Sequence, residues 1–259
     1  DSVFLDYEYA SFGGVISGFN IVDFIANMQS SSSDAPTEEI TILDIKVDLK
    51  GKTYDSRVCS SEYVDKPITI AVPEEKTIDL ETLPYSEYLS DQNPIITIEF
   101  EALGDMKLQL FPNLAPNTVN NFISYINNND FEDNQIHRLI TDFVIQGGAV
   151  NNTTCEIEGE MTGNGIVNPL KHYKGVISMA RMSYSYDTAT SQFFIMLDDV
   201  ASLDEEYATF GGVISGFNIL DFLNDKQKPN TQEPAFGIVI TNITIDLNGY
   251  VPNSPICTD

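Results

Sequence analysis

The sequence predicts an all-β domain over residues 94–259, a closed antiparallel barrel with two capping helices. Two observations lead to this class. Most of the region consists of short runs of β-type residues broken by glycine and asparagine, as in antiparallel barrels. Only two segments place apolar residues at helical spacing, so the helices are few and are expected to cap the barrel.

The first two strands of this domain are expected to form a hairpin. Apolar and polar residues alternate in two runs, which are separated by a turn containing Gly104 and Asp105. The alternating apolar residues are Ile96, Ile98 and Phe100 in the first run and Met106, Leu108 and Leu110 in the second.

The remaining elements follow from local signals. The first helix is expected to begin at Pro116, because proline is favoured at the first helical position, and to end at the asparagines of 127–129. The second helix fits Phe217 to Leu223, directly after Gly216. Further strands are expected at 143–146, 175–180, 192–197, 208–214 and 238–247.

An internal repeat divides the chain. Residues Phe12–Ile21 recur without change as Phe210–Ile219, and about half of the positions in 5–59 are identical to those in 203–257. Such self-similarity indicates a duplicated unit. We therefore expect residues 1–59 to be the C-terminal third of a first barrel domain whose earlier part is missing. Residues 60–93, rich in proline and acids, are expected to be a linker, and residues 94–259 a complete domain.

The composition excludes several classes of function. The chain has 13 Lys+Arg against 39 Asp+Glu, a net charge of −26. Nucleic acids and anionic lipid surfaces repel such a polyanion, so no nucleic-acid partner is expected. No apolar run reaches the roughly 18 residues of a membrane helix, so no membrane insertion is expected. Three cysteines and two histidines are too few and too scattered to predict a metal site.

The residues give little support for covalent catalysis, and the stronger candidate for a functional residue is an arginine. The chain has no Gly-x-Ser-x-Gly elbow, and Cys155 lies in an Asn/Thr loop without a basic neighbour to activate its thiol. Arg138 is one of only three arginines and lies in the otherwise apolar stretch 136–145. Spacing alone leaves three roles open for it: a solvent-facing cation, a partner of a carboxylate, or a functional group.

Five motifs between residues 95 and 247 occur together in a characteristic order: Leu114–Phe122, His137–Gly148, Gly175–Arg181, Ser191–Ile195 and Leu203–Gly211. In order and spacing they resemble the cyclophilins, the cyclophilin-type peptidyl-prolyl cis-trans isomerases, and residues 164–172 resemble bacterial members in particular. The resemblance implies an eight-stranded antiparallel barrel capped by two helices. It also implies rotation about X-Pro peptide bonds without a cofactor, with proline-containing polypeptides as partners.

The resemblance further assigns site residues. Arg138 matches the catalytic arginine, and Gln146 matches the glutamine that bonds the substrate backbone. Ser202 stands where cyclosporin-sensitive members carry tryptophan, which implies weak binding of that drug. The pocket for the proline ring is matched by Phe143, Phe194 and Leu203, and Val144 replaces a methionine that is usual there. The neighbouring peptide groove is matched by Ala180, Arg181 and Gln192. His137 precedes the arginine as it does in the family, and Tyr207 stands where many members have histidine.

The chemistry of the reaction is consistent with this set of residues. Resonance makes the peptide C–N bond resist rotation by ~18–20 kcal/mol. A guanidinium placed at the prolyl nitrogen bonds its lone pair more strongly when the bond is twisted, and we expect Arg138 to act in this way. The main hypothesis is therefore an active isomerase that assists protein folding. The alternatives are a non-catalytic binding module for proline-containing segments, or a surface-display or spacer unit.

The cysteines predict a disulfide. Cys257 lies past the last expected strand, Cys59 holds the same place in the repeat, and Cys155 is the other cysteine of the complete domain. The sequence therefore predicts a Cys155–Cys257 bridge with Cys59 unpaired, against the alternative of three free thiols. Cysteines in an acidic, linker-joined array favour a secreted or cell-surface location over a cytoplasmic one.

Overall fold

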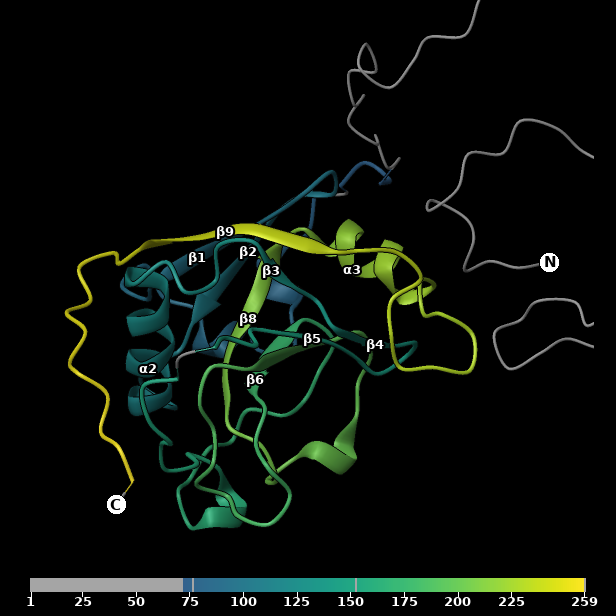
Figure 1. Cartoon of the computed structure of the whole chain (residues 1–259). Helices are drawn as coiled ribbons and strands as arrows, with labels where there is room; N and C mark the ends of the chain where they lie inside the picture. Colours follow the sequence, from purple (N-terminus) through teal and green to yellow (C-terminus); the bar gives the residue numbers. More distant parts are fainter. Residues whose placement is uncertain (1–71, 76, 152, 259) are drawn as a thin grey trace, which may run out of the picture. The chain divides into compact units, whose positions relative to one another are not determined.

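The computed structural model describes residues 72–75, 77–151 and 153–258 (Figure 1). The predicted domain fragment at 1–59, most of the predicted linker and Cys59 lie outside the described residues.

The described residues form one antiparallel sheet of nine strands. The strands are β1 (Ile95–Phe100), β2 (Gly104–Leu110), β3 (Asn134–Gln135), β4 (Arg138–Ile140), β5 (Val144–Gly147), β6 (Val176–Met179), β7 (Phe193–Met196), β8 (Thr209–Ser215) and β9 (Val239–Asp246). Their order in the sheet is β3-β9-β1-β2-β8-β6-β7-β5-β4. The hairpin predicted from the alternation of apolar residues is confirmed, and Phe100 pairs with Gly104. Its turn is at 101–103, however, so Gly104 and Asp105, which were expected in the turn, are the first two residues of β2.

The sheet has nine strands where eight were expected, because the segment 134–140 is interrupted. Its two parts are the outer strands β3 and β4, and only Ile136 and His137 lie between them. The backbone N–H of Ile136 donates to Ile238 (3.0 Å), and that of His137 donates to Gln146 (3.1 Å). The chain therefore changes its partner from β9 to β5 over two residues, which brings the two ends of the curled sheet onto one segment.

Both helices begin where the sequence predicted. Helix α2 spans Pro116–Asn127 and α3 spans Phe217–Asn224. The side chain of Glu160 accepts from the backbone N–H groups of Asn117 (3.1 Å) and Thr118 (2.7 Å), so a carboxylate caps the N-terminus of α2. None of the described helices has the length and apolarity needed to cross a membrane.

The end of the segment expected to be a linker packs onto the sheet. The 3₁₀ helices η2 (Leu80–Thr82) and η3 (Ser86–Tyr88) flank the buried side chains of Leu83 and Tyr85. The Tyr85 hydroxyl donates to the carbonyl of Val213 at 2.7 Å. Ile78, Tyr88 and Leu89 pack against the same cluster, but the apolar residues of this segment follow no regular period, so the sequence did not reveal this packing.

The predicted Cys155–Cys257 disulfide is confirmed, with Cα atoms 5.7 Å apart. Nearby, Ile157 forms isolated β-bridges to both Ala189 and Cys257. The bridge therefore ties the C-terminal segment to the loop that follows β5.

Candidate active site

The site is built on a row of residues that crosses four neighbouring strands. Arg138 of β4 is the direct partner of Gln146 on β5, Gln146 is the partner of Phe194 on β7, and Phe194 is the partner of Ser178 on β6. Direct cross-strand partners point to the same face of a sheet. The fold thereby places one cation, one amide and one aromatic ring side by side, although they come from distant parts of the sequence.

This face carries a cavity of about 200 Å³. The residues that line it were all predicted from the resemblance: Arg138, Phe143, Val144, Gln146, Ala180, Arg181, Phe194, Leu203 and Tyr207. Of the predicted site residues, only His137 and Gln192 are not part of this lining. His137 is exposed. Gln192 holds the side chain of Gln146, whose amide donates to Gln192 Oε1 at 3.0 Å.

The apolar wall of the cavity lies opposite the barrel core. Along β5 and β7, Val144 and Phe194 point to one side while Ile145 and Ile195 enter the main core. Both Val144 and Phe194 are buried. The ring of Tyr207 meets that of Phe194 edge-on, with centroids 5.5 Å apart. The result is a rigid apolar surface next to the polar row.

Arg138 is held by two neutral amides. Its Nη1 donates to Gln146 Oε1 at 3.1 Å, and its Nε donates to Gln232 Oε1 at 2.8 Å. Its guanidinium carbon lies 5.7 Å from the centroid of the Phe143 ring. Among the described residues no carboxylate pairs with it, so its positive charge is not neutralised by an ion pair.

Arg181 is fixed in the cavity wall. Its guanidinium lies between the rings of Tyr186 and Tyr207, 4.6 and 4.8 Å from their centroids. Its Nη2 lies 3.2 Å from Glu206 Oε2, and its side chain is only 8% exposed. Arg181 therefore stabilises the wall that Tyr207 forms. The sequence analysis assigned no role to Tyr186, which lies outside the five motifs, or to Glu206, which lies inside the motif Leu203–Gly211.

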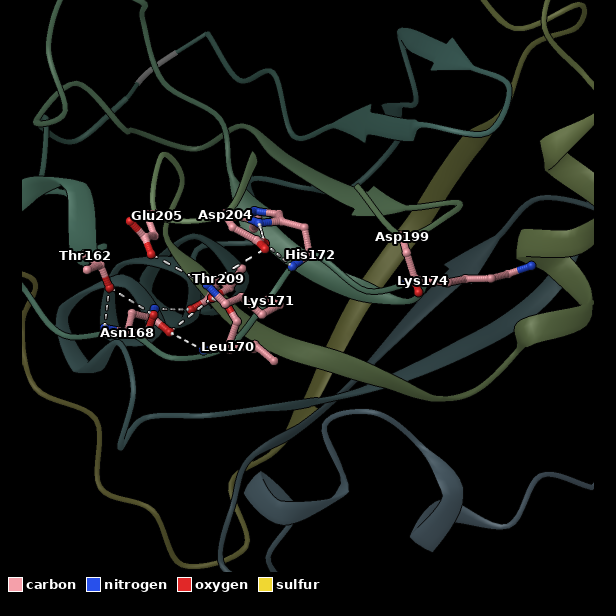
Figure 2. A network of polar contacts seen from close by, with 11 residues as sticks. Thr162, Asn168, Leu170, Lys171, His172, Lys174, Asp199, Asp204, Glu205 and Thr209 are labelled. Atoms are coloured by element: carbon pink, nitrogen blue, oxygen red, sulfur yellow. Dashed lines mark hydrogen bonds and ion pairs between the residues drawn. The ribbon is translucent and has the colours of Figure 1, made fainter. Parts of the chain in front are cut away.

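Figure 2 shows a network of polar contacts that includes the buried side chain of His172. His172 Nδ1 lies 3.2 Å from Asp204 Oδ1, and its Nε2 lies 3.2 Å from Ser178 Oγ. The His172 ring stacks on Phe194 with centroids 6.0 Å apart. Burial lowers the pKa of His172, because the apolar surroundings disfavour its charged form.

This network positions the loop that contains Leu203 and Tyr207. Asp204 follows the 3₁₀ helix η5 (Ala201–Leu203) and accepts from the His172 backbone N–H at 2.8 Å. Figure 2 also shows Asn168, whose amide donates to the carbonyl of Thr209 at 2.8 Å at the start of β8. Although Ser178, His172 and Asp204 form a hydrogen-bonded series, Ser178 is fully buried and does not line the cavity, so the series does not provide a nucleophile.

One further residue from the sequence analysis, Ser202, lies next to the lining residue Leu203. Ser202 is exposed in η5, and the weak binding of cyclosporin expected from it stays a prediction. Among the described residues, no group of three or more His, Cys, Asp or Glu side chains is placed to hold a metal ion.

A curled antiparallel sheet with two helices, and an arginine beside an apolar cavity on its outer face, define a cyclophilin-like protein. A family model described as Cyclophilin type peptidyl-prolyl cis-trans isomerase/CLD matches residues 1–47 and 95–245. The chain belongs to this family.

Named relatives agree with the family match. A peptidyl-prolyl cis-trans isomerase of Acinetobacter baylyi is 38% identical over 130 residues, which cover 46% of this chain and 66% of that protein. Peptidyl-prolyl cis-trans isomerase A of Dickeya dadantii is 36% identical over 152 residues, covering 55% of this chain and 80% of that protein. Among solved structures, a cyclophilin-type isomerase of Cryptosporidium parvum matches with a TM-score of 0.53 and 26% identity, covering 60% of this chain and 98% of that chain.

Proposed function

We propose that the chain catalyses cis-trans isomerisation of X-Pro peptide bonds in polypeptides. The observation that carries the proposal is the placement of Arg138 beside an apolar cavity that includes Phe143 and Phe194. The cavity suits an uncharged ring, and the guanidinium supplies N–H donors at its edge. The Cryptosporidium protein was also crystallised in the presence of the dipeptide Ala-Pro, which supports a proline-containing ligand for this chain as well.

The mechanism follows from what the transition state requires. Rotation removes the conjugation between the prolyl nitrogen and its carbonyl, so the nitrogen lone pair becomes a better hydrogen-bond acceptor. A donor from Arg138 to this lone pair stabilises the twisted state more than either planar state. A charge-assisted hydrogen bond of ~2–3 kcal/mol corresponds to roughly a hundredfold in rate. The apolar wall holds the ring and excludes water, which strengthens the bond. The Gln146 amide, fixed by Gln192, is placed to bond the substrate backbone.

A protease-coupled or exchange-NMR assay on an X-Pro peptide tests the proposal. The wild-type chain is expected to accelerate exchange, and Arg138→Ala to lower kcat/KM about a hundredfold while the domain stays folded. Lys107→Ala, which removes an exposed cation from β2, is the matched control for loss of a positive charge. Wild-type rates in a folded Arg138→Ala variant would refute the mechanism. Peptide binding without accelerated exchange would instead favour the alternative, a non-catalytic binding module.

We also propose that residues 1–59 belong to a second copy of the domain. The internal repeat supports this, as does the match of the same family model to residues 1–47 and 95–245. The contacts of segment 134–140 with both β9 and β5 support a closed barrel. The similarity to the Acinetobacter and Dickeya proteins supports a bacterial type.

A secreted or cell-surface location is the last part of the proposal. Disulfides persist in oxidising environments and are rare in reducing ones, so the Cys155–Cys257 bridge supports it. Partners in such a location would be unfolded or extracellular polypeptides that contain proline.

A further inference from the structure

The loop between α3 and β9, residues 225–238, binds the free edge of β4 (Figure 1). The backbone N–H of Leu139 donates to the carbonyl of Gln232 at 2.8 Å, and that of Thr141 donates to the side chain of Gln227 at 2.9 Å. The loop is itself folded back as a small hairpin, with a β-bridge between Gln227 and Pro234. It therefore presents its central residues to β4 in a defined register.

Gln232 contacts β4 twice. Its backbone carbonyl accepts from Leu139, and its side-chain carbonyl accepts from Arg138 Nε at 2.8 Å. Leu139 is fully buried, so the first contact is anchored in the core. The backbone bond to Leu139 therefore holds Gln232 in place, and its side chain accepts from Arg138 from this fixed position.

The two acceptors hold different parts of the guanidinium. Gln232 takes the Nε hydrogen and Gln146 takes one Nη1 hydrogen. A guanidinium is planar and carries five N–H donors in a fixed arrangement, so one bond to strand β5 and one to the loop 225–238 fix the plane and its rotation. Within the described part of the chain, the Nη2 group has no hydrogen-bond partner, and its donors remain for a substrate.

We propose that Gln232 is a positioning residue for the isomerase reaction, holding the Arg138 guanidinium in the orientation that meets the prolyl nitrogen. This inference rests on the proposed function. Gln232 does not line the cavity and does not touch the substrate; it acts through Arg138. The hydrogen bond from Arg138 to the prolyl nitrogen is strongest when the X-Pro bond is twisted. A misoriented guanidinium therefore raises the barrier to rotation more than it weakens binding of the planar substrate.

The test compares leucine substitutions at neighbouring positions. Gln232→Leu keeps the backbone bond to Leu139 and removes only the acceptor for Arg138 Nε. It is expected to lower kcat about tenfold while KM changes less than twofold. Gln232→Glu retains an acceptor and is expected to restore kcat to within about threefold of wild type. Glu233→Leu, at an exposed position of the same loop, is expected to leave kcat unchanged.

A spectroscopic readout separates this proposal from the proposed function. The chain has only three arginines, so the Arg138 Nε–H resonance can be assigned by comparing variants. Its hydrogen exchange is expected to accelerate in Gln232→Leu but not in Gln232→Glu or Glu233→Leu. An active wild type with undiminished kcat in Gln232→Leu would overturn the positioning role, as would an equal loss in Glu233→Leu. An inactive wild type would overturn the proposed function instead. Even in that case, unchanged Nε–H exchange in Gln232→Leu would refute the hydrogen bond between Arg138 and Gln232.

Discussion

Arg138 and Gln146 are direct cross-strand partners on β4 and β5, and the arginine Nη1 donates to the glutamine Oε1 at 3.1 Å. The two residues lie opposite each other on the two strands of one hairpin, whose turn contains Asp142 with φ at 54°. The hairpin thus brings the cation and its acceptor together by register alone. Phe194 extends the same row from β7, so the proposed donor and the apolar pocket share one rigid surface.

Gln146→Leu is expected to lower kcat/KM about tenfold, because it removes one of the two acceptors that orient Arg138 and the amide proposed to bond the substrate backbone. A coupled assay measures the change, and circular dichroism checks that the sheet remains. Gln192→Leu is the matched comparison, since it leaves the Arg138–Gln146 bond in place and is expected to cost less. Equal losses in the two variants would contradict a direct role for Gln146.

The sequence could predict most of the elements because their signals are local. Alternation gave β1 and β2, and Pro116 and the asparagines at 127–129 gave the limits of α2. β3 and β4 have only two and three residues, too short for any period to show. Their existence depends on hydrogen bonds to β9 and β5, which are tertiary contacts.

The site divides in the same way. The cavity lining could be predicted because it falls inside the five motifs. Gln232 could not, because it lies in a loop without periodicity and meets Arg138 across 94 positions of sequence. His172 lies in the segment that resembles bacterial members, but its sequence neighbours give no hint of Asp204, which comes from a distant part of the chain, or of Ser178, which lies in β6. Such supporting contacts are created by the fold.

Tyr207 is expected to act through its ring and not its hydroxyl. Within the described residues the hydroxyl has no hydrogen-bond partner, whereas the ring contacts both Phe194 and Arg181. Tyr207→Phe is therefore expected to leave kcat/KM within twofold of wild type. Tyr207→Ala is expected to raise KM about tenfold, since an aromatic contact and a cation–π contact are lost together. Steady-state kinetics on one X-Pro peptide decides this, and a large defect in Tyr207→Phe would show that the hydroxyl is needed.

The Cys155–Cys257 disulfide is expected to contribute to stability. It closes a loop with a sequence separation of 102 residues, for which chain entropy gives at most ~4.7 kcal/mol. The double variant Cys155→Ser, Cys257→Ser is expected to lower the free energy of unfolding by about 2–4 kcal/mol. Denaturant titration measures the loss, and Cys59→Ser serves as the control for removal of a cysteine. Equal unfolding midpoints for the double variant and wild type would contradict a stabilising bridge.

His172 is expected to make stability depend on pH below the ordinary histidine pKa of about 6.5. Burial lowers the pKa of His172 in the folded state, although the nearby Asp204 acts in the opposite direction. Above about pH 6.5 the residue is neutral in both states, and its contribution to stability is fully present. As the pH falls further, the unfolded chain takes up a proton that the folded chain resists. The free energy of unfolding therefore decreases until the lowered folded-state pKa is reached, by about 1.4 kcal/mol for each tenfold difference in proton affinity.

The comparison that isolates this effect is the change in unfolding free energy between pH 7.5 and 5.5 in wild type and in His172→Gln. The other titrating groups are common to both proteins, so their contributions cancel in the difference. The variant is expected to be less stable at pH 7.5, because the contacts with Asp204 and Ser178 are altered, but to lose less stability on acidification. Identical pH dependence in the two proteins would mean that His172 does not stay neutral in the folded state. The folded protein would then contain a buried imidazolium that stacks on Phe194 and pairs with Asp204.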